Sequence, residues 1–204
     1  MSFIINIPNN KRLIFIHIPK NGGMSMVKTL EILNPYRPYS SLLGHLTFLE
    51  TEQILTHNNK DIYFCISRNP WDRMVSYYNY ISQKKPDEHG VTDLHNKINS
   101  GMLFGEFVDI IIAEKRNIFR PQYEYMINSE NNICVNVLSL EKINEDLQLF
   151  LNKQGLENKF SMTKINTSKH VHYSSFYDSN ELIEKVAKFE KGIIDYHNYK
   201  FEKK

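Results

Sequence analysis

The pattern of apolar and polar positions along the chain predicts strands that alternate with helices. Short apolar runs with the composition of buried strands occupy residues 12–18, 61–67 and 132–140. Apolar residues at helical spacing occupy residues 23–33, 103–114, 142–153 and 179–190. Such an alternation is typical of an α/β fold in which helices cover both faces of a parallel sheet. We therefore expect one three-layer domain over residues 1–204, with a central, mostly parallel sheet flanked by helices.

Start signals predict one more helix. In "NPWDRMVSYYNYIS" Asn69 suits the N-cap, Pro70 the first helical position and Asp72 the first turn. The next stretch, residues 83–101, is polar and contains one Pro and two Gly. We expect this stretch to be an exposed loop.

The segment "FIHIPKNGGMS", residues 15–25, links the first predicted strand to the first predicted helix. Gly22 and Gly23 allow a tight turn, and the N–H groups at a helix start favour an anion. Lys20 adds a positive charge and Ser25 a hydroxyl donor. The lysine precedes the glycines, so the loop does not match the nucleotide-binding pattern G-x-x-x-x-G-K-[ST]. We interpret it as a P-loop-like anion site that needs no metal, with a plain strand-to-helix turn as the alternative.

Composition and charge limit the remaining possibilities. The chain has 204 residues and a net charge of +2, so no overall field points to nucleic acid or membrane. No apolar run approaches the roughly 20 residues that span a bilayer, and the N-terminal stretch is a poor signal peptide. We expect a cytoplasmic protein. Cys65 and Cys134 lie in apolar runs, which predicts buried free thiols.

A second motif, "SRNPWDRMVSYYNY", places Arg68 at the end of a predicted strand and Ser76 two turns into the next helix. A guanidinium has fixed, fork-shaped donors that suit a phosphate, and a nearby hydroxyl can add another bond. The alternative is that Arg68 pairs with Asp72 while Ser76 only packs.

Together the two motifs resemble those of the carbohydrate sulfotransferases, the broad family of heparan and chondroitin sulfotransferases and their bacterial relatives. Further segments share the resemblance: "GHLTF" (44–48), "RPQYEYM" (120–126), "LEKINEDLQLFL" (140–151) and "INTSKH" (165–170). The resemblance implies that the chain transfers a sulfuryl group from 3′-phosphoadenosine 5′-phosphosulfate (PAPS), leaving PAP. The implied acceptor is a hydroxyl of a carbohydrate or glycoconjugate, with neither nucleic acid nor metal involved.

The resemblance also implies roles for individual residues. The first motif, Lys20, Asn21, Gly22, Gly23, Met24 and Ser25, would hold the 5′-phosphosulfate; the family usually has Thr where this chain has Asn21 and Met24. Arg68 and Ser76 would hold the 3′-phosphate. The polar loop with Asn166, Ser168 and Lys169 would close over the nucleotide, an ordinary connecting loop being the alternative.

Two catalytic residues are expected. Lys20 would stabilise the charge that develops on the leaving group and the sulfonate oxygens. The acceptor hydroxyl needs a general base, a role suited to a neutral His, and the resemblance places His45 of "GHLTF" in it. Glu50 and Glu52 are the fallback bases.

Two further residues, His17 and Gln122, are assigned to the acceptor. A buried, structural His17 is the favoured alternative, because alternation places it on the face of Phe15. An Mg-ATP-dependent small-molecule kinase and an inactive relative that binds PAP or PAPS remain as alternative functions.

Overall fold

The computed structural model describes most of the chain. The described residues are 2–33, 40–41, 44–56, 58–83, 91–114, 119–156, 162 and 171–204. They gather into two compact units, each described by itself below. The first contains residues 1–68 and 122–167, and the second contains residues 69–121 and 168–204. The single domain over residues 1–204 stays a prediction.

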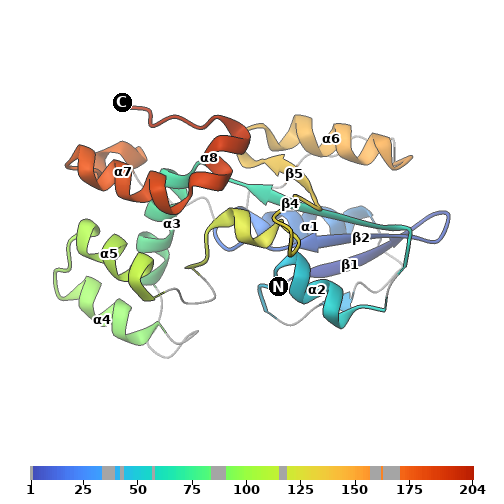
Figure 1. Ribbon diagram of the computed structural model, residues 1–204, viewed down its shortest axis with the longest axis horizontal. Coiled ribbons are helices and arrows are strands. Elements are labelled where there is room, and N and C mark those ends of the chain that lie inside the picture. Colours follow the sequence, from blue (N-terminus) through green and yellow to red (C-terminus); the bar gives the residue numbers. More distant parts are fainter. Residues whose placement is uncertain are drawn as a thin grey trace. The chain divides into compact units, whose positions relative to one another are not determined.

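The first unit is built on a sheet whose described strands lie in the order β3-β1-β2-β4-β5 (Figure 1). Their bounds are β1 Phe3–Ile7, β2 Lys11–Ile16, β3 Ser40–Ser41, β4 Asp61–Ser67 and β5 Asn136–Ser139. The pairs β2–β4 and β4–β5 are parallel, whereas β1 is antiparallel to both its neighbours. All of these strands except β1 therefore run in one direction, as a mostly parallel sheet requires.

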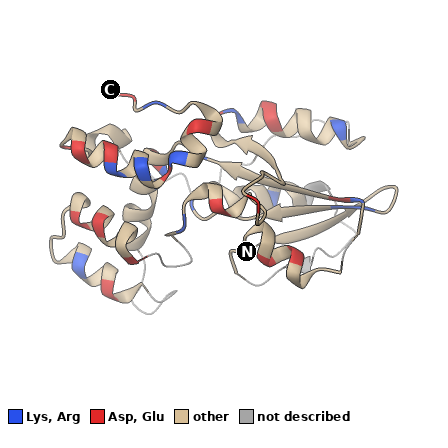
Figure 2. Ribbon diagram, in the orientation of Figure 1, with Lys and Arg blue, Asp and Glu red and all other residues tan. Residues whose placement is uncertain are grey.

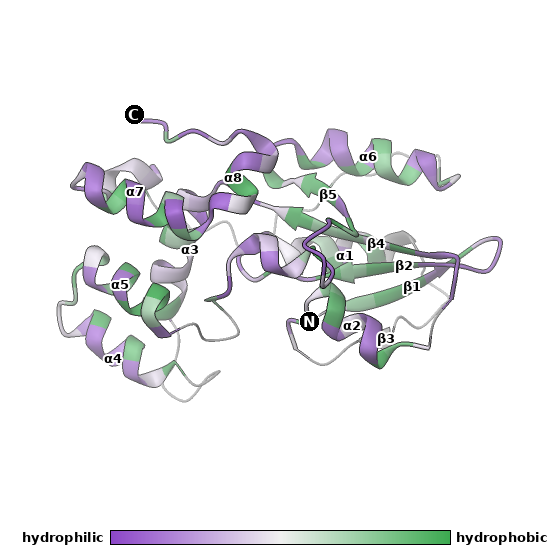
Figure 3. Cartoon of the chain, viewed as in Figure 1, coloured by the Kyte–Doolittle hydropathy of each residue, from purple (hydrophilic) through white to green (hydrophobic). Residues whose placement is uncertain are grey.

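Helices cover both faces of this sheet. Met26 and Leu30 of α1 (Gly23–Leu33) and Leu147 of α6 (Ile143–Lys153) pack with Phe15 and Phe64 in one buried cluster. On the opposite face, Phe48 of α2 (Phe48–Ile54) lies edge-to-face against Tyr63 of β4 at 5.0 Å. Figure 3 shows the strands as mainly hydrophobic and the helices as mixed. The predicted α/β fold with three layers is confirmed.

Strand β1 is absent from our sequence predictions. It pairs with β2 through a hairpin in which Asn9 and Asn10 both have positive φ, 65° and 59°. Asparagine tolerates this left-handed conformation better than most residues, because its short polar side chain bonds locally. The "PNN" sequence was therefore the available signal for the turn.

The second unit consists mainly of helices around an aromatic-rich core. The helices are α3 Pro70–Gln83, α4 Thr92–Asn99, α5 Phe104–Glu114, α7 Asn180–Phe189 and α8 Lys191–His197. Phe107, Val108 and Ile111 of α5 are fully buried together with Val75 of α3 and Val186 of α7. Short 3-10 turns complete the described elements: η4 Tyr173–Phe176 here, and η2 Gln122–Tyr125 and η3 Leu140–Lys142 in the first unit.

A buried ion pair joins the two chain segments of the second unit. Arg73 of α3 pairs with Glu190, which follows α7, and each side chain is 1% exposed. Arg73 also donates to Tyr77 Oη at 3.0 Å and to the Arg120 carbonyl at 3.1 Å. The guanidinium is thus compensated by charge and by hydrogen bonds, as a buried cation must be.

The start of α3 is confirmed as predicted. The Oδ1 atom of Asn69 accepts from the N–H groups of Trp71 at 3.1 Å and Asp72 at 3.2 Å. Pro70 is the first helical residue. Asn69 is thus an N-cap: its side-chain oxygen accepts from N–H groups of the first turn, which have no carbonyl partner within the helix.

Other boundaries differ from the predictions. Residues 92–99 form α4 rather than a loop, with Leu94 and Ile98 buried one turn apart; residues 84–90 lie outside the described residues. The strand predicted over 132–140 begins only at Asn136. A second helix, α8, follows directly on α7. Cys65 and Cys134 are both free thiols, as predicted. Cys65 is buried, but Cys134 is only half-buried, so the burial predicted for Cys134 is wrong.

Candidate functional site

The anion loop of the first unit connects β2 to α1 with an unusual backbone. Among the described residues, five that are not glycine have positive φ; four are asparagines, and the fifth is Lys20 at 69°. A left-handed lysine costs roughly 1–2 kcal/mol, so surrounding contacts must hold it. Arg68 supplies one of them, because its Nη1 donates to the Lys20 carbonyl at 2.8 Å. The Arg68 guanidinium therefore contacts the backbone of the loop at Lys20.

The first turn of α1 is arranged for a negative partner. The first helical hydrogen bond runs from Met26 N–H to the Gly22 carbonyl at 3.1 Å, so the N–H groups of residues 23–25 precede it. The helices α2 to α7 each carry an acidic residue in the first turn, whereas α1 carries none. The positive end of the α1 dipole is therefore not neutralised by its own side chains.

The two glycines are required for different reasons. Gly22 has a φ of 77°, and a Cβ atom there would lie 2.9 Å from Leu140 Cδ1. Gly23 has an ordinary helical conformation, but a Cβ atom there would lie 1.9 Å from His17 Nε2. The imidazole of His17 thus fills the space beside Gly23. The sequence contained no signal for either contact.

The remaining residues of the first motif differ in exposure. Met24, where the resembled family usually has Thr, exposes 54% of its surface, while Ser25 is buried. Asn21 is 1% exposed, and its Nδ2 donates to the Ile66 carbonyl and to Gln122 Oε1, both at 2.7 Å. The side-chain donor of Asn21 is therefore engaged by the protein itself.

His17 and His45 form a pair of imidazoles beside the loop. Their ring centroids are 4.5 Å apart, with an edge-to-face angle of 63°. His45 Nδ1 lies 3.0 Å from the His17 carbonyl oxygen. A carbonyl oxygen can only accept, so Nδ1 donates in this contact, and in a neutral imidazole the lone pair would then lie on Nε2. His17 is buried and stacks on Phe15, as the structural interpretation predicts.

The fallback bases have structural partners. Glu50 closes a capping box with Thr47 at the start of α2. Glu52 accepts a hydrogen bond from the Tyr63 hydroxyl, and burial together with this contact raises the pKa of Tyr63. Both carboxylates therefore bond to other groups of the protein. We keep His45 as the candidate general base in this unit.

Some predicted residues lie elsewhere. Ser76 is a buried residue of α3, in the second unit. The predicted loop residues Asn166, Ser168 and Lys169 lie outside the described residues. Gln122 is fully buried at the start of η2 in the first unit, where its amide bonds to Asn21 and to the Arg68 backbone. Its contact with an acceptor stays a prediction.

The family of the chain follows from a comparison with known proteins. The profile of the sulfotransferase family matches residues 4–197. The chain belongs to the sulfotransferase family.

Two other comparisons complete the findings. The solved structure of mouse sulfotransferase SULT7A1 complexed with PAP is similar to this sulfotransferase at 13% identity, covering 94% of this chain and 68% of that chain, with a TM-score of 0.47. A search of curated proteins finds no match.

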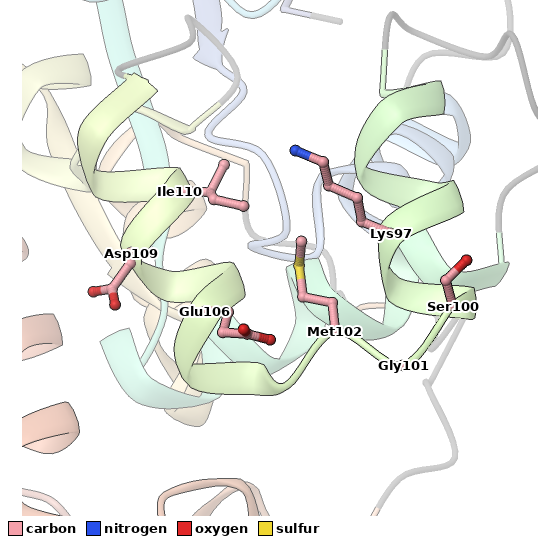
Figure 4. A pocket seen from close by; sticks show the side chains of 7 residues that line it. All are labelled: Lys97, Ser100, Gly101, Met102, Glu106, Asp109 and Ile110. Atoms are coloured by element: carbon pink, nitrogen blue, oxygen red, sulfur yellow. The ribbon is translucent and has the colours of Figure 1, made fainter.

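The second unit of the sulfotransferase contains a pocket with a volume of about 620 Å³. Lys97 of α4 and Ile110 of α5 extend into it from opposite sides, with Met102 between them (Figure 4). Glu106 and Asp109 also line the pocket, so its charge is mixed. Acidic and basic residues are likewise interspersed over the helices of each unit (Figure 2).

Two absences concern only the described part of the sulfotransferase. No helix there is long and apolar enough to cross a bilayer. Nor do His, Cys, Asp or Glu residues within those ranges gather in a group of three that could hold a metal ion.

Proposed function

We propose that this sulfotransferase moves a sulfuryl group from PAPS to a hydroxyl of a carbohydrate or glycoconjugate. Family membership supports sulfuryl transfer. The observation that carries the donor assignment is the left-handed Lys20 backbone, held by Arg68 next to the first turn of α1. Strain at a charged residue beside two glycines and a helix start is typical of a site built for an anion.

The loop would hold the 5′-phosphosulfate through backbone and charge. The N–H groups at the start of α1 come before the first hydrogen bond within the helix and suit anionic oxygens. Lys20 supplies a full positive charge. Gly22 keeps the turn narrow, while Asn21 and Ser25 are buried within it. Met24 contributes no hydroxyl, so its share of the binding is its backbone N–H.

The 3′-phosphate is assigned to Arg68 and Ser76 on the family resemblance. A guanidinium offers five donors in a fixed fork, a geometry that suits a phosphate. The loop with Asn166, Ser168 and Lys169 is assigned to the nucleotide on the same grounds.

Proton transfer is assigned to His45. Its Nδ1 proton is directed at the His17 carbonyl, so Nε2 is the nitrogen that takes the proton of the acceptor hydroxyl. The hydroxyl oxygen then bonds to sulfur. When bound, PAPS would supply the sulfuryl group, and the leaving PAP would keep the electron pair of the broken bond between sulfur and the phosphate oxygen. The charge of Lys20 stabilises the negative charge that builds up during this exchange.

The acceptor class rests on the resemblance to carbohydrate sulfotransferases, which also places His17 and Gln122 on the acceptor side. The burial of both residues favours a supporting role in which they position their neighbours. The cytoplasmic location likewise stays a prediction.

The test is sulfate transfer from labelled PAPS to a panel of glycans and glycolipids, together with PAP binding by calorimetry. We expect Lys20→Ala to reduce turnover about 10²–10³-fold and His45→Ala about 10²–10⁴-fold. Two matched controls should keep wild-type turnover. Lys60→Ala removes a lysine whose Nζ contacts Asn9, and His95→Ala removes a histidine whose Nδ1 lies 3.0 Å from the Ile81 carbonyl.

Three outcomes would contradict the proposal. PAP binding without transfer to any acceptor would favour the inactive relative. ATP turnover that depends on Mg²⁺, without PAP binding, would favour the kinase. Full transfer by His45→Ala would remove His45 as the base while leaving the donor assignment intact.

A further inference from the structure

The amide of Gln122 pairs with the backbone of Arg68 as a strand neighbour would. Gln122 Oε1 accepts from the Arg68 N–H at 2.9 Å, and Gln122 Nε2 donates to the Arg68 carbonyl at 2.9 Å. Strand β4 ends one residue earlier, at Ser67. The side chain therefore extends the hydrogen-bond pattern of the sheet by one residue and fixes the peptide groups on both sides of Arg68.

The same amide also fixes the anion loop. Gln122 Oε1 accepts a second bond, from Asn21 Nδ2 at 2.7 Å, and this Nδ2 also donates to the Ile66 carbonyl at 2.7 Å. Asn21 Oδ1 is buried and has no hydrogen-bond partner among the described residues. Turning the amide over would place this oxygen against two other oxygens, so the two bonds of Nδ2 decide its orientation.

The hydrogen-bonded network also includes the backbone of Lys20. Arg68, whose backbone Gln122 holds, donates from Nη1 to the Lys20 carbonyl at 2.8 Å. Asn21, which Gln122 also holds, is the next residue along the loop. One buried neutral amide therefore bonds both to the backbone of Arg68 and to Asn21, the neighbour of Lys20.

We propose that Gln122 is a positioning residue for the anion site, which sets Lys20 and Arg68 at the separation that the donor requires. This inference rests on the proposed function. It gives Gln122 a role in donor binding, in place of the acceptor contact that the family resemblance implies. The amide must be neutral, because a carboxylate here would oppose the Arg68 carbonyl and attract the two cations away from an anion.

The test compares PAP and PAPS binding by calorimetry in the wild type and three variants. Gln122→Leu removes every bond at similar volume, and we expect at least tenfold weaker binding of both nucleotides. Gln122→Glu keeps the two accepting interactions but adds a negative charge, and should bind at least as weakly as Gln122→Leu. Gln148→Leu, which removes a half-buried amide on α6, is the control and should bind as the wild type does.

A double-mutant cycle separates positioning from a general loss of stability. If the bond between Gln122 and Asn21 acts on the loop, the Asn21→Ala/Gln122→Leu double variant should lose little more affinity than Gln122→Leu alone. All measurements are made where circular dichroism shows the variants folded. If Gln122→Leu does not fold, Gln122→Glu and Asn21→Ala decide the question.

The outcomes distinguish this inference from the proposed function. Wild-type protein that binds neither nucleotide overturns both. Wild-type binding with unchanged affinity in the folded Gln122 variants overturns only the positioning role. Weaker binding that is fully additive in the double variant also overturns it, because independent losses would mean that the amide does not act through Asn21.

Discussion

Gly23→Ala tests whether Gly23 is present for its backbone or for the imidazole beside it. Gly23 is the first residue of α1 and has no positive φ, so an alanine fits its backbone. Helix propensity alone predicts that alanine is more stable than glycine by up to about 1 kcal/mol. A packing conflict with His17 predicts the opposite sign.

The structure sets the size of this conflict. An added Cβ would lie 1.9 Å from Nε2, 2.1 Å from Cδ2 and 2.6 Å from Cε1 of His17. Ordinary contact needs about 3.5 Å or more, so the ring must retreat by about 1.5 Å or more. It has little room, because Phe15 stacks on it at 5.7 Å between centroids and His45 approaches at 4.5 Å. Such overpacking typically costs about 1–3 kcal/mol, and we expect a value at the upper end.

The assay is urea unfolding monitored by far-ultraviolet circular dichroism, which reports on the helices of both units. Gly105→Ala is the matched control: this glycine also lies in the first turn of a helix, but its nearest contact to an added Cβ is 3.9 Å, so the substitution should be neutral or stabilising. In a His17→Ala background the cost of Gly23→Ala should disappear. A Gly23→Ala protein as stable as the wild type, or an equal cost in both backgrounds, would refute the packing argument.

Three further predictions concern stability and reactivity. Asn69→Ala should lower the free energy of unfolding by about 1 kcal/mol, because the first turn of α3 loses its cap; an unchanged value in urea unfolding would contradict this. Arg73→Met should cost about 3–5 kcal/mol by removing the buried positive charge that compensates Glu190, and adding Glu190→Leu should recover much of the loss in the same assay. Burial raises the pKa of the Cys65 thiol, so in native protein Ellman's reagent should label the half-buried Cys134 first and Cys65 only after unfolding. Equal labelling rates for the two thiols would oppose that prediction.

Local patterns were sufficient for the elements that carry the site. The helix over residues 23–33, the strand over 61–67 and the helix that begins at Pro70 agree with the structure, because apolar spacing and capping act within a few residues. The helix over residues 92–99 was missed because the polar composition of the predicted loop masked two buried positions, Leu94 and Ile98, on one face of α4.

Long-range contacts could not be predicted from the sequence patterns. Asn21 and Gln122 are 101 residues apart, and their bond depends on where the loop after β2 runs and where η2 begins. The contact between Gly23 and His17 likewise depends on how α1 lies on the sheet. Sequence motifs thus indicated which residues form the anion loop, but the reason that each one is needed became visible only from their neighbours in space.

The two-segment construction of the second unit has a consequence for how the chain is made. Trp71 of α3 donates from Nε1 to the Ile183 carbonyl and its own carbonyl accepts from the Tyr177 hydroxyl, over separations of 112 and 106 residues. During synthesis, α3 and α5 emerge well before residues 173–186, which complete their core. At about 5–20 residues per second, their apolar faces wait roughly 3–20 s for partners. The nascent chain should therefore be most prone to aggregation, and most in need of a chaperone, within this interval.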